Sequence, residues 1–100
     1  MIDAVAWLER QIAGAPEQLR ERMLAAVMPA DNVAQALADA AFLCLRRALE
    51  NPDDALDLLA ADALLTHACA AAAEQGDDAL MRFTESLGAP QFQQLIEQRA

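Results

Sequence analysis

Residues 33–50 read V-A-Q-A-L-A-D-A-A-F-L-C-L-R-R-A-L-E, a run that contains neither glycine nor proline. At about 100° per residue, the apolar side chains of this run form two neighbouring helical stripes, and the polar ones share a narrower arc. The first stripe holds Val33, Leu37, Ala40, Ala41, Cys44 and Ala48, and the second holds Ala38, Phe42, Leu45 and Leu49. A helix that is apolar around most of its circumference must be covered around most of it.

A second run of the same kind follows the Asn51-Pro52 break. Its two apolar sides hold Leu58, Leu59, Leu65, Cys69 and Ala73, and Leu56, Ala60, Ala63, Leu64 and Ala71. Asn51 as the cap, Pro52 as the first residue and acids in the first turn are typical of a helix start. We therefore expect two long helices, about 31–50 and 52–75, in a central antiparallel hairpin with Leu45 and Leu65 in its core.

The composition of the whole chain predicts an all-α fold. Alanine and leucine are its commonest residues, β-branched residues are few, and 56% of the chain is hydrophobic. Alanine and leucine favour helices, whereas strands favour β-branched residues. Glycines and prolines divide the chain into six expected helices at about 2–13, 16–28, 31–50, 52–75, 77–87 and 90–99. We expect one compact domain, residues 1–100, in which short helix pairs flank the hairpin.

Charge and sequence bias exclude several classes of partner. The net charge is −9, and all seven basic residues are arginine. This balance argues against binding to nucleic acid or to an anionic membrane, and the alanine- and arginine-rich, lysine-free bias is typical of a GC-rich, bacterial genome. The N-terminus lacks the basic region of a signal peptide, and uncharged runs stop at about a dozen residues, short of the roughly 20 that span a bilayer. We therefore expect a cytoplasmic protein.

Residues 62–73, D-A-L-L-T-H-A-C-A-A-A-A, contain the only histidine and one of the two cysteines. His67 and Cys69 lie two residues apart, about 200° around a helix, and so cannot act as a pair. Asp62, Thr66 and Cys69 share one side of the expected helix, whereas His67 shares the other with Glu74. Asp62 needs a partner if it is buried, for example Arg82 or Arg99, or Thr66 can instead bond back to the Asp62 carbonyl. We keep Asp62, Thr66, Cys69 and His67 as candidate ligand-binding residues beside a purely structural role.

Other chemistry finds little support in the sequence. In the expected hairpin, Cys44 and Cys69 differ in height by roughly 16 Å, too far for a disulfide, so both should be free thiols. There is no C-x-x-C, no paired Glu-x-x-His, no phosphate-binding loop and no nucleophile elbow, so we expect no metal, cofactor or catalytic residue. Asp53, Asp54 and Asp57 are typical of a helix N-terminus.

The leading functional hypothesis is a non-enzymatic helical protein–protein interaction module or assembly subunit. Its surplus of apolar helix surface favours a homodimer, with Trp7, Leu56 and Leu64 as candidate interface residues. The first alternative is a binder of a small apolar or cofactor-like ligand in a groove beside the 52–75 helix. The second is an acidic regulator of a basic partner.

Overall fold

The structure is a computed structural model that describes residues 3–87, and in this range helices joined by short turns and loops are the only regular structure. Five helices follow one another, and the range contains no strand. Four of them are α1 (Ala4–Gln11), α2 (Glu17–Ala26), α3 (Val33–Glu50) and α4 (Ala55–Glu74), and the fifth covers residues 77–87. The all-α prediction is confirmed, and the sixth expected helix, about 90–99, lies outside the described residues.

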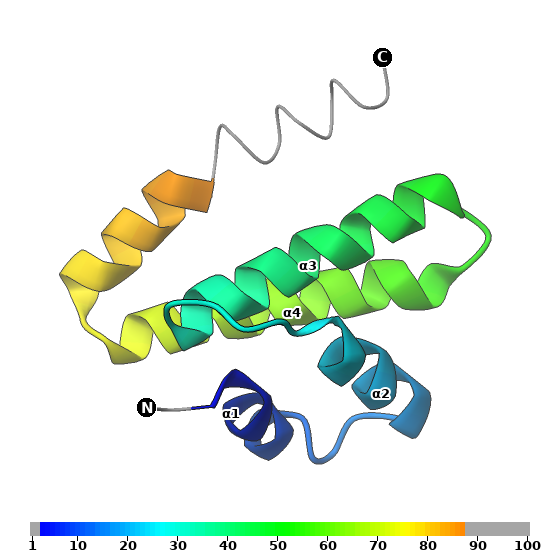
Figure 1. The fold of residues 1–100 in the computed structure, drawn as a ribbon, viewed down its shortest axis with the longest axis horizontal. Helices are drawn as coiled ribbons and strands as arrows, with labels where there is room; N and C mark the ends of the chain where they lie inside the picture. The colour runs from blue at the N-terminus through cyan, green and yellow to red at the C-terminus, as the bar shows by residue number, and fades with distance from the viewer. Residues whose placement is uncertain (1–2, 88–100) are drawn as a thin grey trace.

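α3 and α4 lie side by side and run in opposite directions, joined by the short segment 51–54 (Figure 1). Most of the side chains they bury are alanines, which let two helices approach closely. These residues are Ala34, Ala36, Ala38, Ala40 and Ala41 of α3 and Ala60, Ala61, Ala68, Ala71 and Ala72 of α4. Leu37, Cys44 and Leu64 are fully buried among them, and together these residues form the centre of the molecule.

The short helices lie on different sides of this pair. In Figure 1, α1 and α2 lie below α3 and α4, and the fifth helix rises above them. α1 contributes Trp7 and Leu8 to the core, α2 contributes Met23 and Ala26, and the fifth helix contributes Phe83. α2 contacts α4 more than it contacts α3, whereas α1 contacts α3.

Capping side chains set where the two long helices begin. The Asn32 side chain accepts a hydrogen bond from the Gln35 amide at 2.8 Å, so α3 begins at Val33, two residues after the expected start at about 31. α4 begins at Ala55, three residues later than expected. The Asn51 amide still bonds to the Arg47 carbonyl, and the Asp54 amide bonds to Asn51, so residues 51–54 form a turn. The cap of α4 is therefore Asp54, whose side chain accepts from the Leu56 amide at 3.0 Å.

Gly14, Gly76 and Gly88 were expected to end helices; Gly88 lies outside the described residues, and of the other two only Gly76 does so. Gly76 has φ 115°, a left-handed conformation that favours glycine, and it follows directly after the end of α4. Gly14 does not have a positive φ, and α1 has already ended at Gln11 with Ile12 as its cap. The Ala15 amide bonds to the Ile12 carbonyl, so residues 12–15 form a turn that contains Gly14 without requiring a positive φ there.

α4 is also long and apolar enough to cross a membrane by length and composition. Its 20 residues have a mean hydropathy of 1.4 over an 18-residue window, of which 39% is buried inside the fold. The sequence analysis considered only uncharged runs and therefore expected no segment long enough to span a bilayer. α4 reaches the required length and hydropathy even though it contains Asp57 and Asp62. The core helix of a soluble protein passes the same test, so the finding is weak evidence for a span.

Candidate functional site

The α3–α4 pair presents two faces with different surroundings. We call the side against α1 and α2 the covered face. We call the side that carries a shallow hollow of about 260 Å³ the open face. Neither α1 nor α2 contributes to the lining of this hollow, which consists of Ala41, Phe42, Leu45, Leu58, Ala61, Asp62 and Leu65. Candidate sites must be sought separately on each face.

On the covered face, a charged cluster joins α2 to the start of α4. The Arg22 guanidinium donates to a carboxylate oxygen of Asp57 at 2.8 Å and to one of Asp54 at 3.2 Å. Asp57 is only 4% exposed, and no other charged residue in the range 3–87 is buried. A buried carboxylate needs a partner to offset its lost hydration, and Arg22 supplies it. The cluster therefore acts as a structural tie between α2 and α4.

The electrostatics of this cluster agree with a structural role. Hydrogen bonds to Asp57 and Asp54 raise the pKa of Arg22, so the guanidinium stays charged. The hydrogen bond from Arg22, aided by the Leu56 amide, lowers the pKa of Asp54, so that carboxylate stays ionised near neutral pH. Both shifts favour the paired, charged state. The Arg22–Asp54 contact is therefore a permanent ion pair near neutral pH.

Trp7 ties α1 to the other end of the covered face. Its indole Nε1 donates to a Glu74 carboxylate oxygen at 3.1 Å. Its ring lies 6.4 Å from the His67 ring, centroid to centroid, at an interplanar angle of 77°, an edge-to-face arrangement. The expectation that His67 and Glu74 share one side of the helix is confirmed, and that side is occupied by Trp7. The contact accounts for the histidine as a packing residue.

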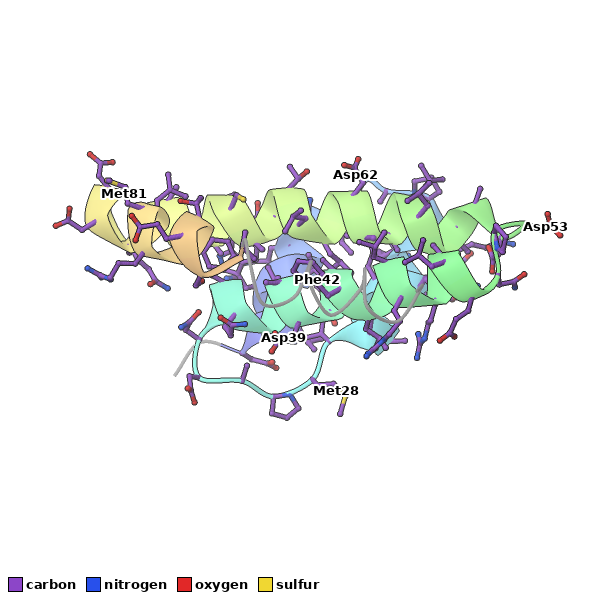
Figure 2. The ribbon with its side chains drawn as sticks, turned by 90° about the horizontal axis from the view of Figure 1, so that it is seen from above. Met28, Asp39, Phe42, Asp53, Asp62 and Met81 are labelled. Atoms are coloured by element: carbon purple, nitrogen blue, oxygen red, sulfur yellow. The ribbon has the colours of Figure 1, made fainter. Side chains whose placement is uncertain are left out.

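On the open face, apolar side chains remain in contact with solvent. Leu58 and Leu59 of α4 are each 55% exposed, and Leu49 near the end of α3 is 39% exposed. Phe42, Leu45 and Leu65 are half-buried along the hollow. Figure 2 shows Phe42 beside the junction of α3 and α4, with Asp62 pointing away from the outer edge of α4. The open face is thus an apolar surface with an acidic rim.

Asp62 is not buried, so its carboxylate does not need an ion-pair partner. Its side chain is exposed, and among residues 3–87 no arginine forms an ion pair with it. The expected pairing with Arg82 is therefore not made, and Arg99 lies outside the described range. The Thr66 hydroxyl donates to the Asp62 carbonyl at 2.9 Å, which is the other arrangement that the sequence suggested. Asp62 lines the hollow, whereas Thr66, His67 and Cys69 do not.

Both cysteines are free thiols. Cys44 is completely buried, and burial raises the pKa of its thiol, so it behaves as a small core side chain. Cys69 is half-buried against the core. Within residues 3–87, no three side chains of histidine, cysteine, aspartate or glutamate gather closely enough to hold a metal ion.

The three residues considered for an interface lie in different environments. Leu64 is fully buried and Trp7 is 4% exposed, so the chain's own core uses both side chains. Leu56 is half-buried at the α4 start and lines a broad depression beside Arg22 and Arg47. The exposed apolar positions on α4 are instead Leu58 and Leu59, which the sequence placed on the opposite stripe.

The Arg22 tie was not recognised in the sequence. Asp57 was read as a first-turn acid, and Arg22 was not considered as its partner. The available signal was position: Asp57 lies three residues before Ala60 and four before Ala61, so it shares a side of the helix with apolar residues. An acid at such a position requires a basic partner from another helix.

Comparisons with protein-family models, with curated proteins and with solved structures find no match to this chain.

Proposed function

We propose that the chain is a single helical domain, built on a hairpin of α3 and α4, that works as a non-enzymatic protein–protein interaction module. Its partner in this proposal is a second copy of the chain, and the contact surface is the open face. The observation that carries the proposal is Leu58, which lines the hollow and is 55% exposed, together with the next residue of α4, Leu59, which is equally exposed. Burial of adjacent leucines is a strong source of association energy.

The arrangement of polar groups supports this choice of face. On the covered face, the anchors Arg22 and Trp7 already have partners. The open face presents apolar side chains with Asp62 at the rim, a pattern typical of interfaces with an apolar centre and a polar edge. The chain's net charge of −9 opposes association of two copies, so the apolar contact must outweigh this repulsion. Raising the salt concentration should therefore strengthen the dimer.

The test is the oligomeric state of matched variants. We expect the full chain to form a dimer in analytical ultracentrifugation at tens of micromolar, and Leu59→Asp to convert it to a monomer. The matched control is Met81→Asp, because Met81 is 59% exposed on the fifth helix, away from the hollow's lining. A monomeric full chain, or equal effects of the two variants, would contradict the proposal.

A second function is favoured by the hollow itself. A cavity of about 260 Å³ lined by six apolar residues and Asp62 could accept a small apolar ligand with one cationic or hydrogen-donating group. In this hypothesis, Leu65→Trp fills the hollow and abolishes binding, whereas Cys69→Ser leaves it intact because Cys69 is not in the lining. Native mass spectrometry of the two purified variants measures whether each one carries a bound species. A bound species retained in Leu65→Trp would exclude the hollow as its site.

A further inference from the structure

We propose that the hollow on the open face is a docking site for the chain's own C-terminal segment, residues 90–99, bound within the same molecule. The segment lies outside the described residues, and the proposal is built from its sequence and from the hollow. The inference goes beyond the proposed function in two ways. Docking of the segment does not require self-association of the chain, and a docked segment would limit self-association through the open face.

The apolar pattern of the segment fits the hollow. Phe92, Leu95 and Ile96 are spaced i, i+3 and i+4, so a helix over 90–99 places them on one side. This is the spacing by which amphipathic helices bind apolar grooves. From residue 92 to residue 99 such a helix rises about 10 Å, the same rise that separates Leu58 from Leu65 along α4. The segment is therefore as long as the hollow's α4 wall.

The charges are complementary as well. Among the described residues that line the hollow, Asp62 is the one that carries a charge, and it lies at the rim. Arg99 is the one basic residue after Leu87, and it follows Phe92, Leu95 and Ile96 on the same helix side. A basic side chain thus accompanies the apolar ones toward an acidic rim. An exposed pair of this kind contributes little energy but favours one orientation of the segment.

The chain can reach the hollow. The fifth helix lies beside the start of α3, because Phe83 and Ser86 line a depression together with Ala34 and Gln35. Ala41, at the near end of the hollow, is about 11 Å further along α3 than Ala34. The five residue steps from Leu87 to Phe92 span up to about 17 Å when extended. Leu87 itself packs against the core, so the connection starts close to the surface that must be covered.

The tether favours this occupant over a second copy. A segment joined by a few residues has an effective concentration in the millimolar range at its site, well above the concentration of free copies. A second copy must therefore displace the segment, or must bind beside it through Leu59, which is not part of the lining. Docking within the chain would make self-association depend on this displacement.

Photocrosslinking of the full chain tests the proposal. Phe92 is replaced by p-benzoylphenylalanine, which keeps an apolar aromatic group and captures neighbouring C–H groups without demanding one register. After irradiation at low micromolar concentration, we expect a product of monomer mass, with the crosslink mapped by mass spectrometry to the α3 or α4 residues of the hollow. The matched control places the same group at Gln94, on the other side of the helix, and should not reach the hollow.

Each other outcome contradicts the proposal. A product of dimer mass would assign the hollow to a second copy, and a crosslink elsewhere, or none, would remove the segment from it. Equal crosslinking from positions 92 and 94 would show that the segment touches the hollow without presenting one particular helix face to it. The oligomeric state of the unmodified chain is measured separately by analytical ultracentrifugation. Failure of docking therefore appears in the crosslinking result, and failure of self-association appears in the ultracentrifugation result.

A second measurement avoids the unnatural side chain. In a Cys69→Ser background, Leu65→Cys places a thiol in the hollow, and its alkylation rate reports whether the hollow is covered. We expect Ile96→Asp to accelerate this alkylation several-fold and Gln94→Asp to leave it unchanged. Equal rates in both variants would overturn the proposal.

Discussion

The covered and open faces of the α3–α4 pair both carry apolar side chains, yet they differ in what the chain places on them. On the covered face, α1 and α2 bring Trp7 and Arg22 to fixed polar partners, Glu74 and Asp57. On the open face, Leu58 and Leu59 remain exposed, and Asp62 has no ion-pair partner among residues 3–87. The difference teaches that directional anchors decide which apolar stripe a short helix covers, because hydrophobic burial alone is non-directional.

The largest expected effect compares one leucine from each face. Leu64→Ala, at a fully buried position, should lower the free energy of unfolding by about 2–5 kcal/mol because it leaves a cavity. Leu58→Ala, at a position that is 55% exposed, should cost less than about 1 kcal/mol. Urea melts at several protein concentrations measure both. A Leu58→Ala loss that grows with concentration would show that a second copy covers the open face, and equal losses at low concentration would break the comparison.

The acids of the two faces give the next effect. Asp57→Ala removes the bond to Arg22 and should destabilise by about 1–2 kcal/mol, whereas Asp62→Ala should change stability by no more than about 0.5 kcal/mol. Arg22→Ala should be more harmful than Asp57→Ala, because it leaves a buried carboxylate without its partner. Denaturant melts of the three variants measure this order. A larger loss for Asp62→Ala than for Asp57→Ala would reverse the assignment of the faces.

The smallest effect concerns acid. The hydrogen bond from Arg22 lowers the pKa of Asp54 in the folded chain below its unfolded value of about 3.9. The resulting stabilisation is fully present above that unfolded value and is lost as the pH falls through the lower, folded value. We expect the melting temperature to fall below about pH 4, and to fall less steeply in Asp54→Asn. Asp53→Asn, which removes a carboxylate from the same turn but no bond to Arg22, is the matched control.

The regular parts of the fold followed from local sequence. The end of α3 at Glu50 and the Gly76 stop were placed correctly, and Asn32 was one of two caps that the sequence offered with Asp31, since each depends on a few neighbouring residues. The start of α4 was placed wrongly because Asn51 and Asp54 are both good caps, and the turn between the long helices decided in favour of Asp54. Local patterns do not contain the geometry of such a connection.

The candidate site was predicted less well than the fold. The sequence separated Asp62 from His67 correctly, and it named the Thr66 bond as one of two arrangements. It could not tell that Trp7 occupies the His67 side, since that contact joins residues sixty positions apart along the chain. It also could not tell that the stripe of Leu58 and Leu59 stays exposed while that of Leu64 is buried, because both stripes are equally apolar.

The contact of Trp7 with His67 and Glu74 also gives the molecule a built-in optical probe. Trp7 is the chain's only tryptophan, there is no tyrosine, and its indole is 4% exposed. Its emission therefore reports one docking event, that of α1 on α4, while far-ultraviolet circular dichroism reports all helices together. If α1 leaves before the long helices separate, the two signals will change at different temperatures, which is the sign of a transition with more than two states.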